Sequence, residues 1–436
     1  MLGLASTSNE KDVLSSTVPP LSDHFHIECF GVMTMDYLAV VDGFPKPNTK
    51  NRTRSINIQG GGNAANVAHV MYHLLGDGYF LCGSHCEISL ISKIGSDYVG
   101  DSIIGEFDSL PESSNVSVSL KKIVRGNQVQ TAFSYIIVSP SDNSDAKERT
   151  ILHTPLSEEL SFDEMNWIVD SVVNPVDILF LDGRHAAAAL RYSSHMSNSL
   201  RNIVMECERM RYGSDLHSFL QVMRCAHAIT MSEEFPTDYV NYRSENDLTI
   251  SKWVKNHKQQ GACDKFLAVH LLLRDLASNG VNIPNFATVT LGSKGSLCFL
   301  KTEDQLLNKI SNLNEIDLYS TTPQSLNDLP KTEVKLFEID DHITGSTVCY
   351  RVIYSQSFVD ESKSIEDTTG AGDTFNAGLL IGLSYYMNSN KVIGWKELER
   401  TLRFANIAAF YTCTGVGARS TLITKEQAQK FWTSLE

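Results

Sequence analysis

The 436-residue sequence contains no apolar run of the roughly 18–20 residues that a membrane helix needs. Its first residues also lack the basic region and apolar core of a secretory signal. Basic residues are scarce, because 37 Lys and Arg stand against 51 Asp and Glu and give a formal charge of −14. Nucleic-acid binding relies on clustered basic side chains. These absences predict a cytoplasmic protein whose partners include neither a membrane nor a nucleic acid.

Paired cysteines are absent as well. The nine cysteines are scattered, with no Cys-x-x-Cys pair and no matched pair of histidines at a zinc-site spacing. Most lie in apolar runs, where free cysteine behaves as a small hydrophobe. We therefore expect neither a disulfide framework nor a zinc framework, as in a reducing compartment. A hydrophobic content of 42% with 20% charged residues is typical of a globular protein with a sizeable core.

The alternation of strand-like and helix-like segments predicts an α/β fold. Residues 176–208 read as strand, helix and strand, and further strands are expected at 226–232 and 286–292. This rhythm is typical of a doubly wound, mostly parallel sheet. Two β-rich stretches outside the rhythm, at about 37–60 and 124–153, predict a small sheet that acts as a lid.

The boundaries of the fold follow from composition. Residues 1–23 are Ser-rich and aperiodic, which predicts a mobile tail, and the folded domain is expected over 24–430. A stretch rich in Asn, Ser and Leu at about 301–331 has weak periodicity and predicts a surface insertion. Asp36 is expected where the first apolar run of the domain ends, a position at which ligand groups gather in open α/β sheets.

The segment with the most chemical information is IEDTTGAGDTFNAGLLIGLSYYM, residues 365–387. The small residues Gly370, Ala371 and Gly372 stand where a long apolar helix begins, so their backbone N–H groups suit a phosphate. Asp373 in the first turn would then accept a proton from an attacking hydroxyl. The alternative is a Gly-rich turn in which Asp373 only stabilises the helix terminus.

Two motifs carry a family resemblance. DTTGAGDTFNAG, residues 367–378, resembles the C-terminal signature of the PfkB or ribokinase-like sugar kinases, and GGGNAANVAHVMYHLLG, residues 60–76, resembles their N-terminal signature. Within the family, ERTILHTP, FLDGRHA, VMECER and TLRFANIAAFYTCTGVGA are most similar to ketohexokinase. The resemblance implies a ribokinase-like α/β domain with a small β-sheet lid. Because that lid often forms a dimer clasp in the family, a homodimer through the lid is a further expectation.

The resemblance also implies roles for individual residues. The expected catalytic residues are Asp373 as the general base together with Gly370, Ala371 and Gly372; the expected sugar ligands are Asp36, Gly62, Asn63 and Asn66; the expected ATP ligands are Arg149, Gly292 and Gly295. Asp367 and Thr369 would hold a monovalent cation such as K⁺. Glu234 would contact Mg²⁺ through water, in a segment where Ser232 and Phe235 replace the family's Asn and Glu.

Each of these roles has a plain structural alternative. Asp36 and Asn63 could cap a turn and a helix, and Arg149 could be a solvated charge at a sheet edge. Gly292 and Gly295 could form a β-turn between two strands. Asp367 and Thr369 could simply shape the turn before Gly370.

The sequence therefore predicts ATP-dependent phosphorylation of a small sugar hydroxyl, with ATP and Mg²⁺ as cofactors and K⁺ as an optional activator. A ribokinase or nucleoside kinase of the same family is the first alternative. A catalytically inactive relative that acts as a binding or scaffold protein is the second, which the altered 231–235 segment permits and the intact 370–373 run opposes. Asn48 replaces an acidic residue typical of ketohexokinases, which leaves the exact sugar open.

Overall fold

The computed structural model describes residues 24–140, 147–170, 175–196, 202–259, 262–276, 283–302, 309–310, 330–341 and 343–436. The predicted tail at 1–23 and most of the predicted insertion at 301–331 lie outside the described residues. None of the described helices is long and apolar enough to cross a membrane.

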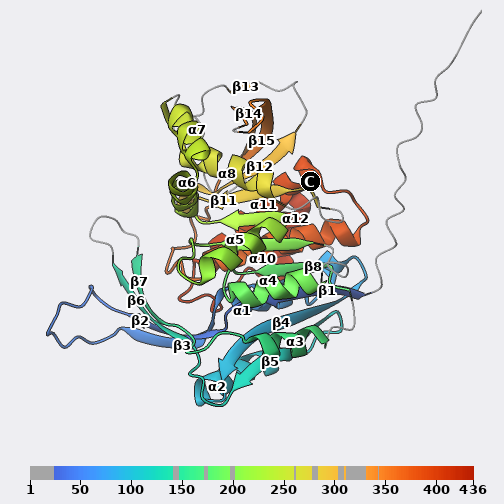
Figure 1. The fold of residues 1–436 in the computed structure, drawn as a ribbon. Coiled ribbons are helices and arrows are strands. Elements are labelled where there is room, and N and C mark those ends of the chain that lie inside the picture. The colour runs from blue at the N-terminus through green and yellow to red at the C-terminus, as the bar shows by residue number, and fades with distance from the viewer. Residues whose placement is uncertain are drawn as a thin grey trace, which may run out of the picture.

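A large twisted sheet forms the centre of the molecule (Figure 1). In spatial order its strands, as far as the structure describes them, are β13 (Lys309–Ile310), β14 (Thr332–Asp340), β15 (Thr347–Ser355), β12 (Ser296–Thr302), β11 (Phe286–Thr290), β10 (Ala228–Met231), β9 (Ile203–Cys207), β8 (Ile178–Leu181), β1 (His24–Phe30), β4 (His85–Gly95) and β5 (Val116–Gly126). All neighbours from β11 to β5 are parallel, whereas β12, β15 and β14 join antiparallel. The prediction of a mostly parallel sheet is confirmed.

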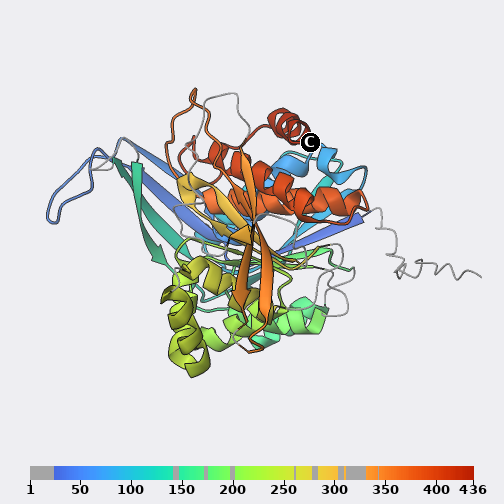
Figure 2. The same ribbon diagram turned by 90° about the horizontal axis from the view of Figure 1, so that it is seen from above.

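Helices cover both faces of this sheet (Figure 2). One hydrophobic core receives side chains from α1 (Asn63–Leu75), α2 (Tyr98–Asp108), α10 (Ala371–Asn388), α11 (Trp395–Thr412) and α12 (Lys425–Ser434). The other receives them from α3 (Phe162–Asp170), α4 (Ala186–His195), α5 (Asp215–Cys225), α6 (Phe235–Asn246), α7 (Leu248–Gln259) and α8 (Asp264–Asp275). Short 3₁₀ turns lie at Tyr79–Leu81 and Gly292–Lys294. Two cores on opposite faces make the domain doubly wound, as predicted.

The order of the strands determines where a site can form. From β1 the chain moves outward through β4 to β5, and it then returns to β8 on the other side of β1 and continues through β9 to β11. The carboxyl ends of β1 and β8 therefore flank a point where the chain direction across the sheet reverses. Ligands of open α/β sheets bind at such points.

A second, smaller sheet projects from the large one beside this point (Figure 1). Its strands, in spatial order, are β3 (Ser55–Gly61), β2 (Thr34–Val40), β6 (Phe133–Pro140) and β7 (Lys147–Thr154). The predicted lid is thus present as a separate sheet, but its second segment starts at Phe133 rather than about 124. Residues up to Gly126 continue β5, which pairs with β4 as far as Gly95. Asp36 lies inside β2 rather than at the end of β1.

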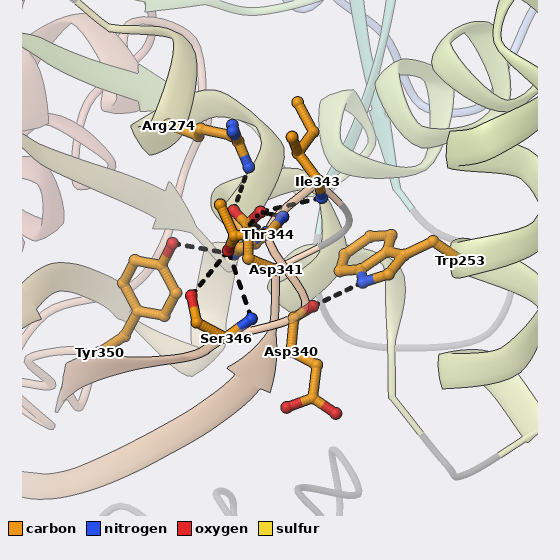
Figure 3. Close-up of polar contacts among 9 residues, drawn as sticks. Trp253, Arg274, Asp340, Asp341, Ile343, Thr344, Ser346 and Tyr350 are labelled. Carbon is orange, nitrogen blue, oxygen red and sulfur yellow. Dashed lines mark hydrogen bonds and ion pairs between the residues drawn. The ribbon is translucent and has the colours of Figure 1, made fainter.

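The β14–β15 hairpin, which extends the large sheet, is fastened to α7 and α8 (Figure 3). Asp341 in the connecting turn accepts hydrogen bonds from the backbone N–H groups of Ile343 and Thr344 at 2.9 and 2.7 Å, and it pairs with Arg274 of α8. Trp253 of α7 donates its indole N–H to the carbonyl of Asp340 at 2.6 Å. Burial raises the pKa of Asp341, but these hydrogen bonds outweigh burial and hold the pKa below its ordinary value.

We predict that Asp341→Asn lowers the free energy of unfolding by about 1–3 kcal/mol at neutral pH, because it removes an ion pair and weakens several hydrogen bonds. A depressed carboxyl pKa gives stability that is present above the unfolded pKa of about 4 and is lost as the pH falls. The difference in thermal midpoint between wild type and variant should therefore shrink in acid. Asp340→Asn, at an exposed neighbour, is the control. Equal effects at both positions would contradict the assignment.

Candidate active site

The two sequence signatures meet at the reversal point of the sheet. Asn66 lies in the first turn of α1 and Asp373 in the first turn of α10, and both side chains are buried. Asn66 donates its amide Nδ2 to Asp373 Oδ2 at 2.7 Å. Residues that are 307 positions apart in the sequence thus form one polar contact at the carboxyl edge of the parallel strands.

The environment of Asp373 tunes its acidity. Burial raises the pKa of Asp373 to about 7, although the hydrogen bond from Asn66 acts in the opposite direction. The charges of Glu208, Asp182 and Asp36 raise the pKa further. A carboxyl group that titrates near neutral pH is suited to accept a proton from a hydroxyl and to release it afterwards.

The turn before α10 shows which glycine the backbone requires. Gly370 has a φ of +78°, and a Cβ there would lie 2.3 Å from Cβ of Ala418, so no larger residue fits. At Gly372 the nearest atom to an added Cβ is Glu206 Oε1 at 4.0 Å. Packing therefore does not require glycine at 372, and open space lies over the helix start. The N–H of Ala371 is already used, since it donates to the carbonyl of Thr368 at 3.3 Å.

The expected sugar ligands lie beside this turn. Asp36 on β2 is 6% exposed and accepts a hydrogen bond from Thr34 Oγ1 at 3.2 Å, and burial raises the pKa of its carboxyl. Asn63, the first residue of α1, donates Nδ2 to Glu206 Oε2 at 3.1 Å. Gly62 precedes α1 with a φ of +92°, and a Cβ there would meet the carbonyl of Val32, so this residue contributes the shape of the backbone. Asn63 and Asn66 contribute side chains, through their contacts with Glu206 and Asp373.

The expected ATP ligands fall into two places. Arg149 on β7 is exposed and donates Nη1 to Thr368 Oγ1 at 2.6 Å, so the small sheet touches the turn before Gly370. Gly292 and Gly295 bracket the 3₁₀ turn after β11, with φ values of +56° and +99°. That loop is held by hydrogen bonds from Tyr354 Oη to the carbonyl of Lys294 and from Ser357 Oγ to the carbonyl of Ser293.

The expected cation ligands differ in how well they suit an ion. Asp367 is buried and accepts hydrogen bonds from the N–H and Oγ1 of Thr369 at 3.0 and 2.8 Å and from the N–H of Gly417 at 2.9 Å. These contacts brace the turn and gather oxygen atoms, the donor type that K⁺ takes. Glu234 is exposed at the start of α6. The described residues contain no group of three His, Cys, Asp or Glu side chains that could hold a metal ion.

Three charged residues at the site were not singled out from the sequence. Glu206 is the last residue but one of the buried strand β9, and burial and then the nearby charge of Asp373 raise its pKa well above the ordinary value. Asp182 follows β8 and accepts hydrogen bonds from the N–H groups of Val32 and Arg184 at 2.8 and 2.9 Å. An acidic residue at the end of an apolar strand was a usable signal for both. Arg419, buried near Asn66, offered no such local signal.

A doubly wound sheet, a small sheet beside its reversal point and a buried carboxyl at a glycine-rich helix start together define a ribokinase-like phosphotransferase. The profile of the "pfkB family carbohydrate kinase" matches residues 25–265 and 354–425, well over half of the sequence. The chain belongs to this family.

Comparisons with individual proteins agree with the fold. The structure is similar to ribokinase from Giardia lamblia, with a TM-score of 0.58, 15% identity and coverage of 94% of this chain and 99% of that chain. It is also similar to Arabidopsis thaliana ribokinase complexed with ribose and ATP, with a TM-score of 0.54, 17% identity and coverage of 94% and 98%. At these identities the likeness concerns the fold.

A curated relative, the nucleoside kinase of Methanothermobacter thermautotrophicus, is 29% identical over 126 residues. That alignment spans 28% of this chain and 35% of the relative. The predictions of the PfkB family and of a ribokinase-like fold are confirmed. These three relatives are two ribokinases and a nucleoside kinase, so the more specific expectation of a ketohexokinase stays a prediction.

The open space at Gly372 gives a prediction for anion binding. Gly372→Ala should leave the free energy of unfolding unchanged or raise it by about 0.5–1 kcal/mol, because alanine suits a helix better than glycine. The added methyl group would occupy the space over the helix start, so MgATP affinity in titration calorimetry should fall about tenfold or more. Gly370→Ala should instead destabilise the fold through its left-handed φ. Unchanged MgATP binding in Gly372→Ala would show that the anion lies elsewhere.

Proposed function

We propose that this chain is an ATP-dependent kinase that phosphorylates a hydroxyl group of a small neutral sugar, with Asp373 as the general base. The observation that carries the proposal is the buried Asp373 carboxyl, held by Asn66 at 2.7 Å and placed in the first turn of α10. A proton acceptor and a helix N-terminus that attracts phosphate thus occupy one place.

On the phosphoryl side, the acceptor oxygen attacks the γ-phosphorus of MgATP, the bond to the β–γ bridging oxygen breaks, and ADP leaves. Asp373 takes the hydroxyl proton. The N–H groups of Gly372 and Asp373 and the dipole of α10 stabilise the transferring charge, because such reactions depend mainly on positioning and electrostatics. Arg149 reaches this turn from the small sheet and supplies a positive charge. Gly292 and Gly295 would border the nucleotide.

On the acceptor side, carboxylates and amides converge: Asp36, Asn63, Asn66 and Glu206. Such groups accept and donate hydrogen bonds in fixed directions and suit adjacent hydroxyls. The buried carboxylates would repel a phosphorylated or carboxylated acceptor, so the pocket favours a neutral one. A hydroxyl missing from the acceptor would leave a buried group unpaired, at a cost of about 1–3 kcal/mol.

Among neutral acceptors we favour a ketohexose such as fructose, because residues 148–155 and 180–186 resemble ketohexokinase segments. A nucleoside is the second candidate, since one curated relative bears the name nucleoside kinase. It would need an apolar slot for the base in addition to the polar groups. The Asn66–Asp373 contact also weighs against an inactive scaffold, which has no need of a buried, high-pKa carboxyl at a helix start.

Cations enter the proposal in two ways. Magnesium arrives as MgATP, and Glu234 would contact it through water, although one exposed carboxylate does not form a metal site by itself. Asp367 and Thr369 with the neighbouring backbone oxygens would bind K⁺. In that position K⁺ would steady the turn that carries Gly370.

The acceptor and the base can be tested together by measuring kcat/KM for fructose, ribose and adenosine with MgATP. We expect fructose to be best, and Asp373→Asn to lower transfer by about 10²–10⁴-fold while MgATP binding persists. A carboxyl whose folded pKa is raised reduces stability once the pH exceeds its unfolded pKa. Asp373→Asn should therefore melt at the same temperature as wild type or higher at pH 8, which separates lost chemistry from lost folding.

The outcomes separate the alternatives. Ribose as the best acceptor would overturn only the fructokinase-like preference, whereas adenosine as the best acceptor would overturn the substrate class. Transfer by Asp373→Asn at the wild-type rate would remove Asp373 from the mechanism. A wild-type protein that phosphorylates none of the three while binding MgATP would favour the scaffold alternative.

We also propose that the chain forms a homodimer through the outer face of the small sheet. Cross-strand pairs join Ile58 to Tyr37, Tyr37 to Tyr135 and Tyr135 to Leu152 in one row. Ile58, Tyr135 and Leu152 are 57%, 52% and 58% exposed, whereas Leu38, Ile136 and Val138 on the other face of β2 and β6 are buried. A contiguous apolar sheet face is a self-complementary surface for a second copy.

Light scattering tests the dimer. The wild type should have the mass of two chains at micromolar concentration, and Tyr135→Lys should have the mass of one, because a lysine in the centre of the face is costly to bury. Leu248→Lys, at an 82% exposed position on α7, is the matched control and should remain a dimer. A monomeric wild type would contradict the proposal.

A further inference from the structure

Arg419 is a buried cation in the loop between α11 and α12, and its role is not explained by phosphate or sugar binding. Its side chain is 5% exposed. It donates Nε to Asn66 Oδ1 at 2.9 Å, Nη1 to Glu106 Oε2 at 2.9 Å and Nη2 to the carbonyl of Gly61 at 3.5 Å. The guanidinium also lies over the ring of Phe107, 5.2 Å from its centroid. These contacts tie Arg419 to Asn66, to the backbone just before α1 and to α2.

The contact with Asn66 decides how that amide is turned. A carboxamide has an acceptor end and a donor end and can face either way. An arginine has only donors, so it requires the Asn66 oxygen on its own side. The Nδ2 group of Asn66 is consequently presented to Asp373 Oδ2, at 2.7 Å. Asp373 Oδ1 is then the oxygen left for an acceptor hydroxyl.

Glu106 on α2 fixes the arginine in turn. Glu106 Oε1 accepts a hydrogen bond from the backbone N–H of Gly60 at 2.6 Å, and its other oxygen pairs with Arg419. Gly60 leaves room for this arrangement, because an added Cβ would lie 2.4 Å from Arg419 Nη1. The chain of contacts therefore runs from α2 through Arg419 and Asn66 to the carboxyl group on α10.

We propose that Arg419 and Glu106 are positioning residues for phosphoryl transfer: they hold Asn66 with its amide nitrogen on Asp373, so that the carboxylate keeps one fixed orientation toward the acceptor. This inference rests on the proposed role of Asp373 as the base. Neither residue touches the reacting atoms, and both act through Asn66.

The charges around Asp373 make this orientation consequential. Among the described residues, the carboxylates that act on it are Asp36 from β2, Asp182 from the loop after β8, and Glu206 and Glu208 at the end of β9. These charges, like burial, favour the neutral acid. The hydrogen bond from Asn66 and the positive charge of Arg419 favour the carboxylate. Without Arg419, the Asn66 amide could turn its oxygen to Asp373 and favour the neutral acid instead.

The first test is Arg419→Met, with Arg419→Lys as the conservative variant. The base must be ionised, so the rate rises with pH through the pKa of Asp373. Arg419→Met should move this rise in rate upward by about one pH unit and so lower kcat at neutral pH by about 5–10-fold, and Arg419→Lys should recover part of both losses. Glu106→Gln should give a smaller shift in the same direction. It also serves as the second variant if Arg419→Met folds poorly.

A double-mutant cycle with Asn66→Ala asks whether Arg419 acts through Asn66. If it does, Arg419→Met should change kcat less than threefold in the Asn66→Ala background. Arg400→Met is the matched control, since Arg400 is 11% exposed and holds the carbonyl of Trp432 and Glu436 far from Asp373. It should reduce stability without moving the pH profile.

A measurement independent of the acceptor keeps the two proposals apart. The ¹³C-carboxyl signal of Asp373, assigned by its loss in Asp373→Asn, can be titrated by NMR in wild type and in Arg419→Met. An upward shift of the Asp373 pKa in Arg419→Met supports the inference. The inference would be overturned by an unchanged titration, by additive effects in the double-mutant cycle, or by the same shift in Arg400→Met. Full transfer by Asp373→Asn would instead overturn the proposed function, whatever Arg419 does.

Discussion

The hydrogen bond between Asn66 and Asp373 is the contact on which the candidate site depends, because it joins the starts of two helices that the chain builds far apart. It forms only if α1 and α10 lie side by side in the first core with their N-termini level. On its other side α10 packs closely on α11, since an added Cβ at Gly378 would lie 2.8 Å from Cα of Ala405. Positioning errors of about 1 Å are enough to cost most of a catalytic effect.

Burial raises the pKa values of the carboxyl groups at this site, and it also makes their charged forms costly in free energy. Asp182 is stabilised by backbone N–H groups of the loop after β1 and of its own loop, so its charge serves to join β8 to β1. Asp36, Glu206 and Asp373 accept no backbone hydrogen bond of this kind among the described contacts, and burial raises the pKa of all four carboxyl groups. The burial of these carboxyl groups close to one another is therefore electrostatically unfavourable. A polyol would relieve this cost, because it brings many hydroxyl donors.

The local parts of this structure could be predicted from the sequence, and the long-range parts could not. The run from Gly370 to Asp373 is a continuous motif, so its pattern alone indicated a helix start whose N–H groups suit a phosphate. The boundary near residue 124 was missed because alternating residues look alike in either sheet, and only pairing with β4 assigns them. Glu106 and Arg419 are 313 positions apart, and no spacing rule relates them.

The small sheet contributes to both the proposed acceptor site and the proposed dimer interface. Successive residues of a strand point to opposite faces, so β2 carries Asp36 toward the site and the half-buried Tyr37 on the other face of the small sheet. The same strands are fastened to the site from the other direction, because Asn57 of β3 donates to the carbonyl of Val416 at 3.1 Å and Arg149 of β7 to Thr368. A second copy docked on the outer face would restrict the motion of the sheet that carries Asp36. The proposed dimer surface and the proposed acceptor site would therefore share strand β2 but use opposite faces of it.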